Sequence, residues 1–265
     1  MEAWFDVGVN MPDKRLDPET TLQHALEKGV HHMLLIGTSY PHSAEAAKLA
    51  EQYPINMLST AGVHPHNAKD VSSHFIDELR HLATNPKVVA IGECGLDFNR
   101  NFSPADQQLS VFEQQLQLAC EIQLPVYLHE RDAFEQQFAL LEKYHKDLPA
   151  AIVHCFTGNL EQMQAYASLG CYFGITGWVC DPKRGEDLRT ALPHISIDKL
   201  LLETDAPYLK PKTLKTKSRN NEPATIPHIA QFVAELLDVD VQYLKHHCWR
   251  NTLSVLNLEP DFASE

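Results

Sequence analysis

The feature that most constrains the fold of this 265-residue chain is a series of short apolar or β-branched runs, each ending in a polar or Gly-rich turn. These runs predict eight strands, at residues 4–9, 32–36, 56–61, 88–92, 125–128, 151–153, 171–175 and 199–202. Several of the runs are apolar throughout, which is typical of strands that are covered on both faces.

The segments between these runs have the periodicity of amphipathic helices. We expect helices at residues 18–28, 43–52, 72–84, 104–122, 132–144 and 160–168, a shorter one at 182–192, and two more at 227–237 and 240–256. Eight alternating strand–helix units in about 250 residues predict a closed (β/α)8 TIM barrel of the α/β class. The alternative is an open doubly wound sheet, but no GxGxxG motif follows the first strand. We expect one domain, residues 1–265, in which the polar segment 207–223 is an active-site loop.

In such a barrel, catalytic residues lie at the carboxyl ends of the strands. Four of the predicted strands are followed there by an acid or an imidazole: Glu93, His129, His154 and Asp205. One Glu, two His and one Asp form a mixed nitrogen and oxygen set that suits zinc, manganese or magnesium. A single His at a strand end is more often structural, and Asp205 could simply cap a turn. The coincidence at four separate strands favours a metal site.

Three further features lie beside the expected mouth of the barrel. His64 and His66 flank a Pro after the third strand, where they are either exposed imidazoles or residues that contact a phosphate and assist proton transfer. Arg131 could bind a phosphate through two hydrogen bonds, or pair with Asp132 at a helix start. The Lys-rich run 210–219 is either a solvated loop or a rim that attracts anions.

Composition narrows the range of functions. The formal net charge of −13 argues against a protein that wraps nucleic acid with a basic surface, although it leaves room for a metal that meets phosphates. No apolar run approaches the roughly 18 residues of a membrane span, and residues 1–6 lack the basic and apolar pattern of a signal peptide, so we expect neither feature. Six Cys without CxxC spacing predict a cytoplasmic protein with reduced thiols. We expect Cys94 and Cys155 to pack as small apolar groups, with a Cys nucleophile as the alternative.

Five motifs together resemble the TatD family of metal-dependent deoxyribonucleases, which belongs to the amidohydrolase-like barrel superfamily. They are FDVGVN at 5–10, AGVHPH at 61–66, IGECGLDF at 91–98, VHCFTG at 153–158 and LETDAPY at 202–208. The resemblance extends over residues 5–256, and the runs 95–102 and 174–181 are particularly similar to the bacterial branch of the family. The combination of motifs is highly specific, whereas the HPH motif alone would be weak.

The resemblance implies a divalent metal held by Glu93, His129, His154 and Asp205. It implies hydrolysis of phosphodiester bonds in single-stranded DNA, with RNA as a second substrate, by a 3′→5′ exonuclease. The bacterial branch suggests a magnesium requirement, with Mn²⁺ or Zn²⁺ as alternatives, and a role in DNA repair. We expect a monomer with no membrane partner.

The chain departs from the family pattern after the first strand, where many members have an HxH pair of ligands. The matching positions here are Gly8 and Asn10. Gly has no side chain that could bind a metal, and Asn offers only a neutral carbonyl. This departure predicts an oxygen-rich site for Mg²⁺ or Mn²⁺ rather than a tightly held pair of zinc ions.

Our mechanistic hypothesis is metal-assisted phosphodiester hydrolysis. Asp205 would orient or deprotonate the attacking water, and His64 or His66 would steady a phosphate or protonate the leaving oxygen. Because few phosphates would be contacted, we expect a shallow salt dependence. The fold and the ligands do not fix the substrate, so a small-molecule amidohydrolase or esterase is the alternative, and a non-catalytic scaffold is a third reading.

Overall fold

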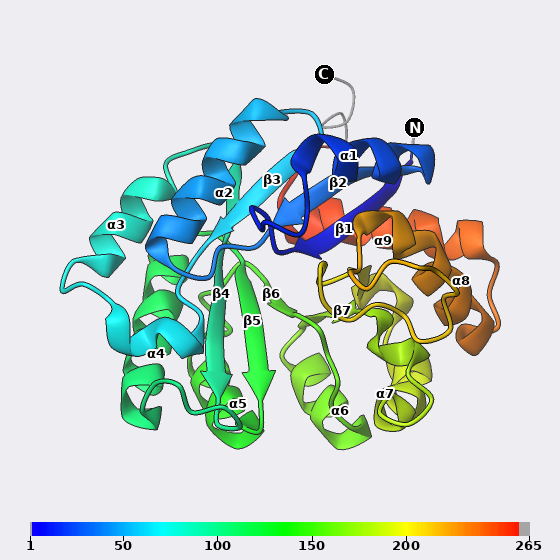
Figure 1. Ribbon diagram of the computed structural model, residues 1–265. Helices are drawn as coiled ribbons and strands as arrows, with labels where there is room; N and C mark the ends of the chain where they lie inside the picture. The colour runs from blue at the N-terminus through cyan, green and yellow to red at the C-terminus, as the bar shows by residue number, and fades with distance from the viewer. Residues whose placement is uncertain (1, 260–265) are drawn as a thin grey trace.

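The computed structural model describes residues 2–259, and its centre is one sheet of eight strands (Figure 1). The strands are β1 (Trp4–Val9), β2 (Val30–Leu35), β3 (Met57–Ala61), β4 (Val88–Asp97), β5 (Val126–Arg131), β6 (Ala151–Val153), β7 (Tyr172–Ile175) and β8 (Leu200–Leu202). Their order in the sheet follows the order of the chain, and every neighbouring pair is parallel.

The first and last strands meet and close the sheet. Val9 forms a parallel bridge with Ala206, just beyond β8. The Asn10 N–H donates to the Ala206 carbonyl, and the Asp205 N–H donates to the Gly8 carbonyl, both at 2.8 Å. The predicted (β/α)8 barrel is therefore confirmed.

Helices follow the strands as the periodicity predicted. They are α1 (Pro18–Glu27), α2 (Tyr40–Gln52), α3 (Phe75–Leu82), α4 (Ala105–Ile122), α5 (Phe134–Tyr144), α6 (Leu160–Ser168), α7 (Glu186–Ala191), α8 (Ile226–Leu237) and α9 (Val241–Val255). The prediction started α2 too late, because Ser39 caps the helix by accepting the His42 N–H and Pro41 lies within its first turn. It started α7 too early, because the Asp181 carboxylate accepts the N–H groups of Lys183 and Arg184 in a turn.

The largest boundary error concerns β4, which we expected to end at residue 92. The strand continues to Asp97, and β5 pairs with it as far as Arg131. The extension depends on Gly92 and Gly95, whose φ angles of 146° and 134° suit glycine alone, and on a register shift between Gly92 and Cys94. Glu93 therefore lies within a strand rather than at its end, and Asp97 also reaches the mouth of the barrel.

One hydrophobic cluster contains side chains from all eight strands and, among its buried helix residues, only those of α9, as expected of the barrel interior. The strands contribute Phe5, Leu34, Leu58, Ala90, Tyr127, Ile152, Tyr172 and Leu201. Trp249 and Val255 of α9 belong to the same cluster, so α9 closes the end of the barrel at which the strands begin. The opposite end, where the strands finish, is left for the site.

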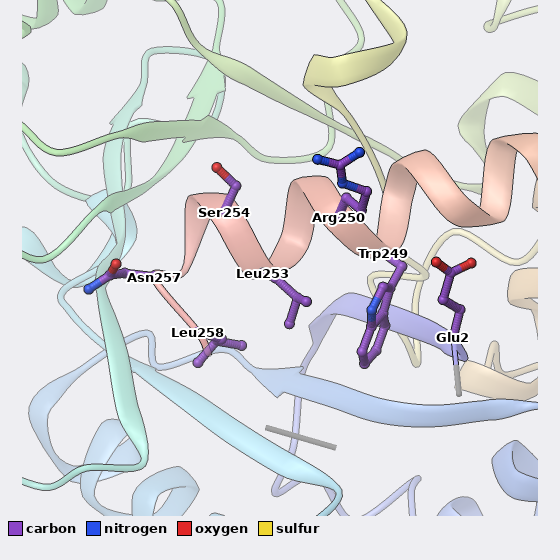
Figure 2. A pocket seen from close by; sticks show the side chains of 7 residues that line it. All are labelled: Glu2, Trp249, Arg250, Leu253, Ser254, Asn257 and Leu258. Carbon is purple, nitrogen blue, oxygen red and sulfur yellow. The ribbon is translucent and has the colours of Figure 1, made fainter. Parts of the chain in front are cut away.

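At the end closed by α9, the molecule has a cavity of about 440 Å³ (Figure 2). Its walls are Glu2, before β1, and residues on or just after α9: Trp249, Arg250, Leu253, Ser254, Asn257 and Leu258. None of the residues predicted for the site lines this cavity. It lies at the opposite end of the barrel from the candidate residues.

Candidate metal centre

The four predicted ligands come from four different strands and meet at the mouth of the barrel. Glu93 lies in β4 and His129 in β5, while His154 follows β6 and Asp205 lies shortly after β8. Glu93 Oε1 lies 2.9 Å from His129 Nδ1 and 3.8 Å from His154 Nε2. His154 Nε2 lies 3.9 Å from Asp205 Oδ1. The structure thus brings together the residues that strand positions alone had suggested.

The electrostatics of this cluster favour positive charge. Burial raises the pKa of Glu93, but the three imidazoles around it outweigh burial and hold the pKa well below its usual range. Burial lowers the pKa of His129 and His154, but the neighbouring carboxylates outweigh it and raise the two values to about 9 and about 10. An ionised carboxylate at the centre of the mouth therefore attracts either protons or a metal cation.

His154 is held in place by a buried carboxylate that the sequence analysis did not single out. Glu203 Oε2 lies 2.7 Å from His154 Nδ1 and accepts a hydrogen bond of 2.6 Å from the Tyr127 hydroxyl. Glu203 Oε1 accepts the Cys155 N–H. With Nδ1 bound to the carboxylate, His154 Nε2 faces Glu93 and Asp205. A carboxylate behind an imidazole is the usual support of a metal-binding His.

Glu203 and Tyr127 also explain why position 8 is glycine. A Cβ atom on Gly8 would overlap Glu203 Oε2 and the Tyr127 hydroxyl. Asn10 instead donates from Nδ2 to Asp205 Oδ1 at 2.7 Å, so its amide nitrogen rather than its carbonyl faces the site. The first strand therefore supports the site through Asn10, while the space beside Gly8 is filled by Glu203 and Tyr127.

His64 lies among the potential ligands, but its hydrogen bonds give it a different role. Its Nε2 lies 3.5 Å from Glu93 Oε1. His64, Glu93 and His129 each offer one potential metal-ligating atom, and these three atoms lie within 4.8 Å of one another. However, His64 Nδ1 accepts the His66 N–H, at 3.1 Å. An imidazole that accepts at Nδ1 carries its proton on Nε2. His64 Nε2 is thus a hydrogen-bond donor into the site, and burial lowers the pKa of His64 to about 3, which keeps it neutral.

The donor set fits a divalent cation. His129 Nε2 is buried and has no hydrogen-bond partner within residues 2–259, since Asp97 Oδ2, 3.4 Å away, lies outside hydrogen-bonding geometry. A buried imidazole nitrogen that lies beside a carboxylate and makes no hydrogen bond is suited to ligate a cation. The mixture of nitrogen and oxygen donors suits Mg²⁺, Mn²⁺ or Zn²⁺.

Comparison with known proteins agrees with this geometry. Residues 5–257 match the family described as TatD related DNase. The chain belongs to the TatD family. It is 50% identical to proteins named 3′-5′ ssDNA/RNA exonuclease TatD from Rahnella sp. and Salmonella typhimurium, over 91% of this chain and 93% and 94% of theirs.

Solved structures of TatD-family proteins have the same fold. The TatD homologue YjjV of Escherichia coli superimposes with a TM-score of 0.89 at 27% identity, over 97% of this chain and 98% of that one. A TatD-family hydrolase of Entamoeba histolytica gives 0.87 at 25% identity, over 96% and 98%. A phosphotriesterase homology protein of Escherichia coli, at 16% identity and a TM-score of 0.69 over 96% and 98%, shares the fold.

In this TatD-family chain, His66 and Asp97 extend the centre outward. His66 Nε2 lies 2.7 Å from Asp97 Oδ2, and Asp97 is only 1% exposed. Asp97 was not predicted as a site residue, because the predicted strand ended at residue 92, five residues before it. It links His66 to the same group of imidazoles that contains His129.

Arg131 lies at the exposed end of β5. Within the described part of the chain its guanidinium has no ion pair with Asp132, whose carboxylate accepts the Asn99 Nδ2 donor at 2.6 Å. The alternative of a helix-start ion pair is therefore wrong. Most of the 210–219 run is exposed, and Lys210 Nζ donates to the Ser218 carbonyl within it.

The cysteines beside the centre are poor nucleophiles. Cys94 is buried in the core, and burial raises the pKa of its thiol far above the usual range. Burial and the nearby Asp205 likewise raise the pKa of Cys155. Both thiols stay protonated at neutral pH, which supports the expected packing role.

None of the helices within residues 2–259 combines the length and the hydropathy needed to cross a membrane.

Proposed function

We propose that this chain is a metal-dependent nuclease that hydrolyses phosphodiester bonds of single-stranded DNA and RNA from the 3′ end. The observation that carries the proposal is the convergence of Glu93, His129, His154 and Asp205 on one barrel mouth. The chain is also half identical to relatives named for this activity. The sequence resemblance and the composition support a role in DNA repair and a place in the cytoplasm.

Glu93, His129, His154 and Asp205 are the residues that would hold the cation, and Mg²⁺ is our choice. When bound, a divalent cation neutralises charge on a phosphate and makes a nearby water more acidic. Two of the four proposed ligands are carboxylates and Gly8 supplies none, so the set is less rich in nitrogen than an HxH-containing site. That composition supports Mg²⁺ or Mn²⁺ over zinc.

Asp205 is the base that we assign to the attacking water. Burial raises its pKa to about 7, an effect that Glu93 reinforces and that His154 opposes. A carboxylate that lies beside the cation and has one oxygen free of the protein can orient a water and accept its proton. Asp205 Oδ1 accepts a hydrogen bond from Asn10, so Oδ2 is the oxygen that would take the proton.

His64, His66 and Arg131 would position the scissile phosphate. His64 Nε2–H points into the site beside Glu93 and can donate to a phosphate oxygen. Its pKa of about 3 makes it a donor of hydrogen bonds rather than a proton source at neutral pH. Arg131, exposed at the end of β5, can contact a phosphate with two parallel hydrogen bonds.

The test is digestion of single-stranded oligonucleotides that carry a label at either the 5′ or the 3′ end, with Mg²⁺, Mn²⁺ or Zn²⁺. We expect single-nucleotide products from the 3′ end with Mg²⁺ and no cleavage in EDTA. A Glu93→Gln variant is the matched inactive control, because it removes the central charge and keeps the shape. Cyclic amides and lactones are assayed in parallel.

Hydrolysis of the small amides or lactones without any cleavage of DNA or RNA would contradict the nuclease proposal. Products released from the 5′ end would leave the nuclease intact and overturn its polarity. Undiminished cleavage by Glu93→Gln would show that the activity comes from elsewhere.

A further inference from the structure

Two exposed aromatic side chains flank the metal centre. The aromatic residues among the large apolar side chains most exposed within residues 2–259 are Phe102 (54%), Tyr208 (49%) and Tyr243 (49%). Phe102 lies in the loop after β4, and Tyr208 lies in the segment after β8. Tyr243 belongs to α9, which closes the other end of the barrel. Singly exposed apolar side chains are common on protein surfaces, so it is the position of Phe102 and Tyr208 beside the metal centre, and not their exposure, that suggests a ligand.

Phe102 is fixed against the β4–β5 side of the centre. Its ring meets the edge of His66 with 4.7 Å between ring centroids. His66 in turn is held by Asp97 and lies 6.2 Å from His129. The exposed part of the Phe102 ring is therefore close to the proposed ligands.

Tyr208 is fixed on the opposite side, next to Asp205. Its N–H donates to the Asp205 carbonyl at 2.9 Å, and its hydroxyl accepts a hydrogen bond of 2.8 Å from Arg15. The Arg15 guanidinium also lies over the Tyr208 ring, 4.4 Å from its centre, and therefore covers part of one face of the ring. Asp13 pairs with that guanidinium through bonds of 2.8 and 2.6 Å to Nε and Nη2. A guanidinium over an aromatic ring holds the ring in place and leaves its other face for a ligand.

The chemistry of these two surfaces points to nucleobases. A base has an aromatic face that stacks on Phe or Tyr, and the phosphate attached to it complements the charge of Arg15. The two rings lie on either side of Glu93 and Asp205, through the contacts given above. Resting on the proposed nuclease function, we propose that Phe102 and the Tyr208–Arg15 pair stack on bases of the single strand, on either side of the scissile phosphate.

This arrangement explains how an acidic chain could hold a polyanion. Stacking does not depend on charge, so it supplies affinity that a net charge of −13 would otherwise reduce. Every base has an aromatic face, so the contacts tolerate any sequence, as an exonuclease requires.

The test uses the Mg²⁺-loaded protein and short single strands whose 3′-terminal linkages are cleavage-resistant phosphorothioates. The fluorescent base 2-aminopurine, placed at each of the last four positions in turn, is quenched when it stacks. We expect quenching at two positions, one lost in Tyr208→Ala and the other in Phe102→Ala. Each variant is expected to bind about 5- to 150-fold more weakly, the range for one lost stacking contact.

Three controls separate stacking from other roles. Tyr208→Phe keeps the ring and loses the hydroxyl, so it should keep the quenching and most of the affinity. Tyr243→Ala removes an equally exposed ring from the far end of the barrel and should change nothing. An abasic site at the position that Tyr208 quenches should lower the affinity of the wild-type protein for the strand. It should not lower the affinity of Tyr208→Ala any further.

Two results would overturn the inference and leave the nuclease proposal standing. One is that Tyr208→Ala and Phe102→Ala bind the strand and quench 2-aminopurine as strongly as the wild-type protein does, while the wild-type protein cleaves normally. The other is an equal loss in Tyr208→Phe and Tyr208→Ala, which would assign the effect to the hydroxyl and Arg15. Wild type that neither binds nor cleaves single strands would overturn both proposals. Circular dichroism and thermal melting confirm that each variant is folded.

Discussion

The role of Glu203 behind His154 can be tested by the substitution Glu203→Gln, which keeps the shape of the side chain and removes its charge. Both carboxylate oxygens are hydrogen-bonded. Oε2 lies 2.6 Å from the Tyr127 hydroxyl and 2.7 Å from His154 Nδ1, and Oε1 accepts the Cys155 N–H. A Gln has one acceptor oxygen and one NH2 group. Whichever way it is turned, the NH2 group faces a donor that the carboxylate had satisfied.

The structure sets the size of two separate effects. Glu203 is fully buried, so no water can replace the lost acceptor, and an unsatisfied buried donor costs about 1–3 kcal/mol of folding free energy. The second effect is on the metal, because His154 loses the carboxylate that orients its Nε2 toward the site. Loss of such a support typically weakens metal binding by about 10- to 100-fold, or about 1.4–2.8 kcal/mol.

The two effects are measured independently. Isothermal titration with Mn²⁺ gives the metal affinity, and urea unfolding in EDTA gives the stability without the metal. Tyr127→Phe is the matched control, because it removes the hydroxyl that lies 2.6 Å from both Glu203 Oε2 and His154 Nδ1 but leaves the contact between Glu203 and His154. We expect it to lose about 1 kcal/mol of stability and to keep its metal affinity within a few-fold. Unchanged Mn²⁺ affinity in Glu203→Gln, or an equal loss in Tyr127→Phe, would refute this account of His154.

Further predictions follow from the same geometry. Gly8→Ala places a methyl group against Tyr127 and Glu203, so we expect a loss of about 1–3 kcal/mol in urea unfolding, part of which the double variant with Tyr127→Phe should recover. If Gly8→Ala is as stable as wild type, the space beside Gly8 is not filled as described. Asp205→Asn should lower kcat by about 10²- to 10⁴-fold while circular dichroism shows an intact fold, and near-normal turnover would exclude Asp205 as the base. Burial of His32 lowers its pKa from 6.5 to about 4. Between these pH values the unfolded chain binds a proton that the folded chain does not, so stability should fall as the pH drops from 6.5 toward 4, by at most about 1.4 kcal/mol per pH unit. Urea titrations should show a shallower pH slope in His32→Gln, and an unchanged slope would exclude His32 as its source. Arg131→Ala should make the plot of log affinity against log salt shallower by about 0.7 for single strands, and an identical slope would mean that Arg131 meets no phosphate.

The barrel and the convergence of the four proposed ligands could be predicted because both depend on local patterns. Alternation of apolar runs with helical periodicity identified the strands, and residues next to strand ends converge in any such barrel. No further information was needed to predict that Glu93, His129, His154 and Asp205 lie close together. The end of β4 could not be predicted, because its extension depends on two glycines with positive φ and on pairing with β5.

Residues that act through a partner from another strand were missed for a related reason. Glu203 is visible in the sequence as an acid beside Asp205, but its function depends on His154 and on Tyr127, which lie 49 and 76 residues away. Tyr127 looks like an ordinary strand residue because its hydroxyl partner is not local. The proton position on His64 is equally invisible, since it follows from a backbone N–H that only the folded loop brings to Nδ1.

The distribution of charge at the mouth then determines how this chain can meet a polyanion. Glu93, Asp97, Glu203 and Asp205 all lie in or beneath the mouth, and the first three are almost fully buried. A phosphate that approaches these carboxylates is repelled unless positive charge is already present between them. The affinity for single strands should therefore depend strongly on the divalent cation, even though the aromatic rings at the rim contribute regardless of charge. An acidic net charge is consistent with a nuclease of this kind because the local charge at one phosphate, and not the charge of the whole surface, controls binding.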